Sequence, residues 1–260
     1  MLSILPPFFS RCCRTLLDLA LPPVCSGCGA DVVTEGAFCS DCFSSAQRII
    51  SPCCDRCGTL LINETYGGAR KICVSCQLKP PVWRQGRAAF VYDDWSRRMI
   101  LPLKYSDRTE NAAVLSQEMG RAGKALLEQA TVLVPVPMYR GKLWRRRYNQ
   151  AALLAHGLAR RNKVPALLDG LERRRATRAL ARLSPKERYA EIADTIVVRP
   201  EREKRIVGQA VLLVDDVLTT GATASVCADA LLKAGALSVD ILVAARTGKG
   251  DERDVPYPEE

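Results

Sequence analysis

The chain has 260 residues, which is enough for one or two folded domains with a buried core. Its 48% hydrophobic and 25% charged residues are ordinary for a globular protein, and its apolar stretches are far shorter than the ~20 residues of a membrane span. A signal peptide is not expected, because Pro6 and Pro7 interrupt the early apolar run and the first charge, Arg11, follows it. We therefore expect a cytoplasmic protein without a membrane span.

The net charge of +10 is concentrated in one part of the chain. Residues 140–178 contain twelve Lys and Arg against two acidic residues, so this segment alone carries +10. Such an excess favours a polyanionic ligand, either phosphate groups or nucleic acid. A solvated helix face is the alternative interpretation.

Four segments are expected along the chain. Residues 1–24 should form a short N-terminal helical segment, and residues 25–81 are rich in cysteine. Residues 84–248 should form an α/β domain, followed by a polar tail over residues 249–260. In the α/β domain, hydrophobic patterning predicts strands over residues 88–92, 131–136, 193–198, 210–214 and 238–244, and helices beginning at residue 97 and over residues 111–129, 149–161 and 223–234. The last helix joins two strands, which is a parallel βαβ unit.

The cysteines of the second segment form four Cys-x-x-Cys pairs in sequence order. Two thiolates of one pair can occupy two corners of a tetrahedron, and two pairs complete a zinc site with four cysteine ligands. Free or redox-active thiols are the alternative, but no βαβ pattern surrounds these pairs. The spacing therefore predicts a double zinc ribbon with two structural zinc ions. Its expected ligands are Cys25, Cys28, Cys39, Cys42, Cys54, Cys57, Cys73 and Cys76.

Three further cysteines, Cys12, Cys13 and Cys53, do not fit this spacing. They are expected to be spare or buried thiols, although Cys53 could replace Cys54 as a ligand.

An apolar strand ends in the acidic pair Asp215 and Asp216 and then turns into a helix. Backbone N–H groups in such a turn, together with the helix dipole, form an anion site. Two carboxylates beside a phosphate require a partner between them, and ribose hydroxyls with Mg²⁺ would serve. A strand–turn–helix with capping threonines is the alternative, but it leaves the acidic pair unexplained. We call the turn the phosphate loop; it consists of Thr219, Thr220, Gly221, Ala222 and Thr223.

This segment resembles the motif of type I phosphoribosyltransferases that binds 5-phosphoribosyl 1-pyrophosphate (PRPP). The resemblance implies a parallel sheet with flanking helices and PRPP binding by the acidic pair and the phosphate loop. It also implies that pyrophosphate is held by the loop after the strand at residues 131–136, at Pro137, Met138, Tyr139 and Arg140. No protein nucleophile is needed for displacement at the ribose C1, so no catalytic residue is assigned, and His156, the only histidine, is expected to be incidental.

The chain as a whole resembles the competence protein ComF family, in which a double zinc ribbon precedes a phosphoribosyltransferase domain. The resemblance rests on the cysteine pairs, the phosphate loop, Leu103-Lys104-Tyr105 and residues 145–150. In this last motif the family usually has Gly where this chain has Arg147, and Phe where it has Tyr148. The family's usual Gln and Asn are replaced by Leu180 and Glu191.

Three functions are compatible with this resemblance. The first is assistance in handling incoming single-stranded DNA during natural transformation, with the DNA-uptake machinery as a further partner. The second is phosphoribosyl transfer to a small nitrogenous acceptor, and the third is a PRPP sensor without turnover. Aromatic residues among the arginines of residues 140–178 favour single-stranded DNA. Arg173, Arg174 and Arg175 are expected to contact DNA away from the PRPP site. The acceptor, the retention of turnover and the oligomeric state are left open.

Overall fold

The computed structural model describes residues 22–34, 36–65, 67–105, 108–175 and 194–248. The chain divides into two compact units, Met1–Ala46 and Gln47–Glu260. The division falls between the second and third cysteine pairs. Most of the predicted N-terminal helical segment and the polar tail lie outside the described residues, and the predicted domain boundaries stay a prediction.

The first unit is built around the first two cysteine pairs. Its helix α2, Ser40–Ser45, begins after Cys39, whose Sγ accepts a hydrogen bond from the backbone N–H of Cys42 at 3.5 Å. Before it, Val24 and Asp31 form an antiparallel bridge. Gly29, with φ of +81°, allows the chain to turn between these two residues. The unit is thus a small turn-and-helix structure that brings its cysteines together.

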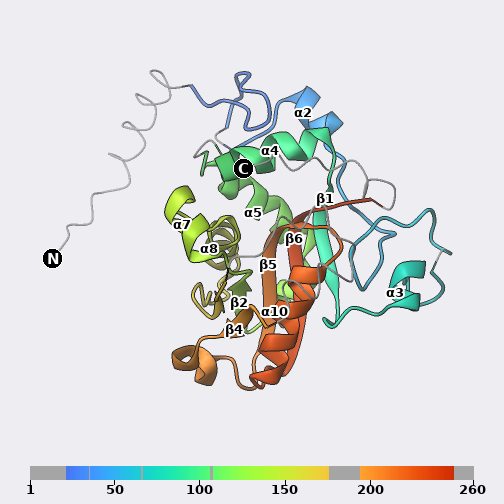
Figure 1. Cartoon of the computed structure of the whole chain (residues 1–260). Helices are drawn as coiled ribbons and strands as arrows, with labels where there is room; N and C mark the ends of the chain where they lie inside the picture. Colours follow the sequence, from blue (N-terminus) through green and yellow to red (C-terminus); the bar gives the residue numbers. More distant parts are fainter. Residues whose placement is uncertain (1–21, 35, 66, 106–107, 176–193, 249–260) are drawn as a thin grey trace. The chain divides into compact units, whose positions relative to one another are not determined.

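The second unit contains a four-stranded parallel sheet in the order β1-β6-β5-β2, which confirms the α/β prediction (Figure 1). Strand β1 spans Gly86–Val91, β2 Val132–Pro135, β5 Ala210–Leu218 and β6 Ser238–Arg246. Side chains of β2 and most of β5 and β6 are buried, as expected for parallel strands covered on both faces.

Helices cover both faces of this sheet. Ile241 and Val243 of β6 share a core cluster with Cys227 and Leu231 of α10, Ala222–Lys233. Leu242, which lies between these two residues of β6, contacts Gly123 on the other face, between α5, Asn111–Ala122, and α6, Lys124–Gln129. Helix α8, Gln150–Asn162, packs beside α5 and buries Leu154, Ala155 and Leu158, whereas His156 is exposed.

One continuous helix over residues 111–129 was expected, but the structure breaks it into α5 and α6 at Gly123. A Cβ at Gly123 would lie 2.6 Å from Cδ1 of Leu242. The close approach of the backbone to β6 therefore determines the junction.

A second, two-stranded sheet lies apart from the main one. Strand β3, Leu171–Arg173, pairs antiparallel with β4, Ile196–Val198. The strand expected over residues 193–198 is thus shorter and joins this small sheet. The remaining elements in the described part of the chain are α3, Val74–Leu78, α4, Asp94–Tyr105, α7, Arg140–Arg146, and the 3-10 helix η2, Pro200–Arg205. Among the described residues, no helix is long and apolar enough to cross a membrane.

Candidate functional site

The acidic pair and the phosphate loop lie at the carboxyl end of β5, where ligands bind in open parallel sheets. The backbone N–H of Asp216 donates to Oδ1 of Asp215 at 2.9 Å. Gly221, with φ of +80°, is the N-cap of α10, and the Ala222 N–H lies 3.4 Å from Oγ1 of Thr220. A left-handed residue followed by a 12-residue helix aims backbone N–H groups at one point, which suits an anion.

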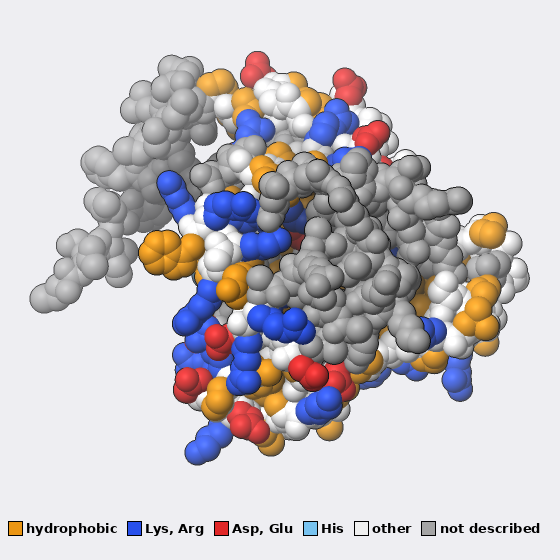
Figure 2. All heavy atoms as spheres, in the orientation of Figure 1, with side chains coloured by type: hydrophobic (Ala, Val, Ile, Leu, Met, Phe, Trp, Pro, Cys, Tyr) orange, Lys and Arg blue, Asp and Glu red, His pale blue; other side chains and the backbone are white. Residues whose placement is uncertain are grey.

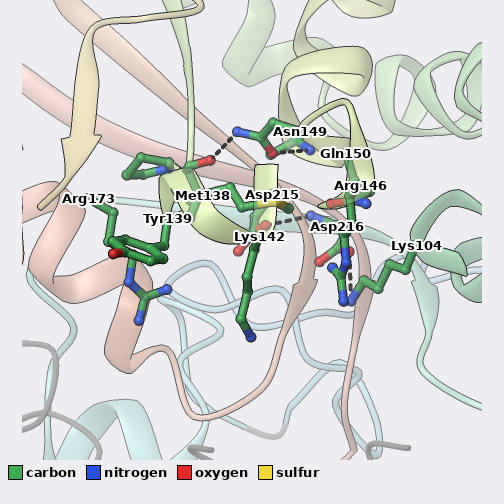
Figure 3. Close-up of a pocket in the computed structure, with 13 residues that line it drawn as sticks. Lys104, Met138, Tyr139, Lys142, Arg146, Asn149, Gln150, Arg173, Asp215 and Asp216 are labelled. Carbon is green, nitrogen blue, oxygen red and sulfur yellow. Dashed lines mark hydrogen bonds and ion pairs between the residues drawn. The ribbon is translucent and has the colours of Figure 1, made fainter. Parts of the chain in front are cut away.

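A cavity of about 170 Å³ adjoins the acidic pair (Figure 3). It combines two carboxyl groups with four cationic side chains from three different elements, α4, α7 and β3. Among the described residues, those that line it are Lys104, Val136, Pro137, Met138, Tyr139, Lys142, Arg146, Asn149, Gln150, Ala151, Arg173, Asp215 and Asp216.

The predicted pyrophosphate loop is only partly in this lining. Pro137, Met138 and Tyr139 line the cavity, whereas Arg140, the first residue of α7, is not among its described lining residues. No residue of the phosphate loop is among the described lining residues either. The loop directly follows β5, and the acidic pair on β5 does line the cavity.

Lys104, from the last turn of α4, forms an ion pair with Asp216 inside the site. Its Nζ lies 2.8 Å from Oδ2 of Asp216, and both side chains are largely buried (Figure 3). The sequence analysis identified Lys104 only within the Leu103-Lys104-Tyr105 motif of the ComF resemblance and assigned it no role in the site. Its role in the site depends on a contact across more than a hundred residues, which no local pattern reveals.

The two carboxylates of the acidic pair stand in different surroundings. Burial, followed by the charge of Asp216, raises the pKa of Asp215 to about 8. Asp216 has the ammonium group of Lys104 beside it. The pair therefore offers one carboxyl group that favours its protonated form and one that is held as an ion pair.

Asn149 and Gln150 fix the backbone around the cavity. The Asn149 side chain donates to the carbonyl of Val136 at 2.9 Å, and its Oδ1 accepts from the N–H of Ala151 at 3.0 Å (Figure 3). The buried Gln150 donates to the carbonyl of Leu103 at 3.0 Å. These bonds tie the start of α8 to the loop after β2 and to the helix turn that carries Lys104.

Arg147 adopts a left-handed backbone conformation at the end of α7, with φ of +63°. This conformation favours glycine. It therefore gives a physical reason for the glycine that the ComF motif usually has at this position.

The structure corrects the expectation that Arg173 lies away from the PRPP site. Arg173 is the last residue of β3, and its backbone forms an isolated parallel β-bridge with Tyr139. Its side chain lines the same cavity as Asp215 (Figure 3). Burial lowers its pKa, and the charge of Asp215 opposes this shift. Arg174 and Arg175 are exposed. The loop positions Leu180 and Glu191 lie outside the described residues.

The eight predicted cysteine ligands form two groups of four. In each group the ligand atoms all lie within 4.8 Å of one another. The Sγ atoms of Cys28 and Cys39 are 3.6 Å apart, and those of Cys57 and Cys73 are 3.8 Å apart. A tetrahedral zinc site with Zn–S bonds of about 2.3 Å requires similar spacings. We call Cys25, Cys28, Cys39 and Cys42 the first cluster, and Cys54, Cys57, Cys73 and Cys76 the second cluster.

Backbone N–H groups support the thiolates, as in structural zinc sites. The N–H of Cys39 lies 3.3 Å from Sγ of Cys25, and that of Cys73 lies 3.3 Å from Sγ of Cys54. Both clusters therefore fit structural zinc. Cys54, not Cys53, belongs to the second cluster; Cys53 is partly buried, and burial raises its pKa. Cys12 and Cys13 lie outside the described residues.

Two cysteine clusters and a parallel α/β domain with an acidic pair at a strand end define a zinc-ribbon protein with a phosphoribosyltransferase domain. The double zinc ribbon domain family matches residues 16–79, and the phosphoribosyl transferase domain family matches residues 152–258.

Relatives of known name match nearly the whole chain. The DNA utilization protein YhgH of Escherichia coli is 30% identical over 235 residues, which cover 88% of this chain and 99% of the relative. Competence protein F of Haemophilus influenzae is 28% identical, covering 92% of this chain and 98% of the relative. Competence protein ComFC of Bacillus subtilis is 26% identical, covering 76% and 78%. The chain belongs to the ComF family.

Proposed function

We propose that the chain binds PRPP with Mg²⁺ at the carboxyl end of β5 and assists the handling of incoming single-stranded DNA in the cytoplasm. The observation that carries the PRPP part is the acidic pair at a strand end, between the N-terminus of α10 and a cation-lined cavity.

Each part of PRPP has a chemical counterpart in the site. The N–H groups of the phosphate loop suit the 5-phosphate, and the carboxylates of Asp215 and Asp216 suit ribose hydroxyls. The cavity that Pro137, Met138 and Tyr139 line also contains three cationic side chains that suit pyrophosphate, those of Lys142, Arg146 and Arg173. Mg²⁺ prefers oxygen ligands and would neutralise the pyrophosphate charge beside the acidic pair.

Calorimetric titration of PRPP in the presence of Mg²⁺ tests this binding site. Replacing both carboxyl groups, Asp215→Asn with Asp216→Asn, should weaken binding by at least about a hundredfold, because the charge-assisted hydrogen bond to Asp216 is lost and the hydrogen bond to Asp215 is altered. Asp229→Asn on α10 is a matched control, since Asp229 pairs with Lys233 on the helix surface at 2.7 Å. Unchanged affinity in the double variant would refute the assignment.

The DNA part is supported by α7 and by the names of the relatives. No residue of α7 is buried. The side chain of Trp144 is 89% exposed, and Arg140, Lys142 and Arg145 lie on the same helix. Figure 2 shows Lys and Arg side chains gathered over the face that carries α7 and α8. An exposed aromatic ring among cations suits stacking on the bases of a single strand without sequence preference. Relatives are named as DNA utilization and competence proteins.

Binding of labelled single-stranded DNA over a range of salt concentrations tests this surface. The logarithm of the binding constant should fall with a slope of about −0.7 per phosphate neutralised. Trp144→Ala should weaken binding at every salt concentration, and Arg145→Ala should also reduce the slope. Lys124→Ala, on α6, serves as a control because its side chain is 80% exposed. If both variants bind DNA like the parent, α7 is a solvated helix face.

Whether the chain turns PRPP over is tested separately, by measuring the release of pyrophosphate. Release from PRPP in the presence of single-stranded DNA or candidate bases would support phosphoribosyl transfer. PRPP binding without release in any of these mixtures would support the sensor alternative.

A further inference from the structure

Trp83 lies between the second cluster and the phosphate loop. Its side chain is 3% exposed and belongs to the main core of the α/β domain. The indole Nε1 donates to the carbonyl of Arg56 at 2.6 Å. Arg56 stands between the metal ligands Cys54 and Cys57, so the indole bonds directly to a cysteine knuckle.

The opposite edge of the Trp83 ring supports the phosphate loop. A Cβ built at Gly221 would lie 2.7 Å from Cη2 of Trp83, with two more ring atoms within 4 Å. Gly221 is the residue whose left-handed conformation turns β5 into α10. The indole ring therefore lies directly against the backbone that we propose for phosphate binding.

The knuckle holds the segment that carries Trp83 through several hydrogen bonds to its backbone. The Arg56 guanidinium donates to the carbonyls of Trp83 at 3.5 Å and Arg84 at 3.1 Å. The carbonyl of Asp55 accepts from the N–H of Gly86 at 3.0 Å. There is no room for a side chain here, because a Cβ at Gly86 would lie 2.8 Å from the carbonyl oxygen of Arg56. A change of knuckle geometry must therefore displace the residues next to it.

Arg246, the last residue of β6, holds the entrance of the phosphate loop. Its guanidinium donates to the carbonyls of Leu218 and Thr219, where β5 enters the phosphate loop. The loop entrance is thus fixed to the sheet, and Trp83 connects the loop to the second cluster.

We infer that Trp83 is a positioning residue of the phosphate loop, and that zinc bound by the second cluster holds the loop in its binding geometry through Trp83. Loss of this zinc by chelation or thiol oxidation would loosen the loop and lower its affinity for phosphorylated ligands. The effect on PRPP rests on the proposed function, whereas the effect on loop order does not. The first cluster, in the separate unit Met1–Ala46, is not expected to act in this way.

Linkage makes the inference reciprocal. If zinc in the second cluster strengthens PRPP binding by a given factor, PRPP must strengthen zinc binding by the same factor. We expect about tenfold in each direction, within the usual range of such couplings.

Hydrogen exchange of the backbone amides of the phosphate loop gives the direct test. Replacing Cys73 and Cys76 by Ser, which removes two ligands of the second cluster, should speed exchange of these amides by about tenfold. The same change at Cys39 and Cys42 in the first cluster is the matched control and should leave them unchanged. Trp83→Phe should also speed exchange while all eight ligands and both zinc ions are retained.

Two further measurements separate this inference from the proposed function and from simple misfolding. Trp95→Phe controls for loss of a buried indole, because Trp95 packs on Phe90 with ring centroids 5.0 Å apart. If the serine variant of the second cluster does not fold, Trp83→Phe still decides the question. In the intact chain, PRPP should slow chelator release of one of the two zinc ions, and Trp83→Phe should abolish this protection.

The possible outcomes differ clearly. Loop exchange that is the same in Trp83→Phe and in the parent would overturn the inference, even if PRPP binds. Faster loop exchange in Trp83→Phe than in the parent, with a parent chain that fails to bind PRPP, would support the inference and refute the proposed function.

Discussion

Replacing Lys104 by Met would leave the carboxylate of Asp216 in the site without the ammonium group that lies 2.8 Å from it. The two side chains are only 9% and 12% exposed, so water cannot readily replace the lost partner. Removing one member of a buried ion pair typically costs about 3–5 kcal/mol, mostly because the remaining charge is uncompensated. We therefore expect Lys104→Met to lower the free energy of unfolding of the α/β domain by about this amount.

Urea unfolding in the presence of zinc and a reducing agent, followed by tryptophan fluorescence, measures this loss. Trp95 lies on the same helix as Lys104 and is buried, so its emission should report unfolding around the pair. Asp216→Asn in the Lys104→Met background should recover much of the loss, because it removes the uncompensated charge. Lys124→Met is the surface control: Lys124 pairs with Glu128 at 4.0 Å with both side chains exposed, and it should change stability by less than about 1 kcal/mol.

Destabilisation by Lys104→Met no greater than that by Lys124→Met would show that the ion pair with Asp216 does not stabilise the domain. Losses of the two single variants that simply add in the double variant would show that the two charges do not interact.

Three further predictions concern Asp215, Arg147 and the metal. The pKa of Asp215 is raised from 3.8 to about 8, so the folded form keeps a proton that the unfolded chain releases at lower pH. The free energy of unfolding should therefore fall as pH rises from about 4 to about 8, by up to about 1.4 kcal/mol per pH unit, and Asp215→Asn should flatten this slope in urea unfolding at several pH values. Arg147→Gly should stabilise the domain by about 1 kcal/mol because it relieves a left-handed residue, whereas Arg145→Gly, inside α7, should destabilise it by a similar amount; thermal unfolding that ranks them in the opposite order would contradict the assigned backbone conformation. Metal analysis of anaerobically purified protein should give two zinc ions per chain, and removal of two ligands from either cluster should leave one; a parent chain without zinc would contradict the ribbon assignment.

The parts of the site that the sequence predicts are those encoded by short-range pattern. The acidic pair follows an apolar strand directly, and the cysteine pairs are spaced for zinc, so both could be identified without coordinates. Strand order then explains why the loop after β2 meets the end of β5, because the two strands are neighbours in the sheet.

The remaining contributions come from long-range packing. Lys104 reaches Asp216 from another helix, and Arg173 enters the cavity through a small sheet that forms separately from the main one. Gly123 divides a predicted helix only because the backbone approaches Leu242. These contacts depend on how the elements pack against one another, and the period of the hydrophobic pattern does not specify this packing.

The contact between Trp83 and Gly221 has a consequence for how this family can diverge. A side chain at residue 221 would need the space that the indole fills, and its φ of +80° would strain any residue other than Gly. A relative with a smaller residue at the position of Trp83 would have more space beside residue 221, but the positive φ would still favour Gly in its phosphate loop. The same relative would lose the indole donor to the knuckle carbonyl, so its ribbon and its transferase domain would be free to evolve separately.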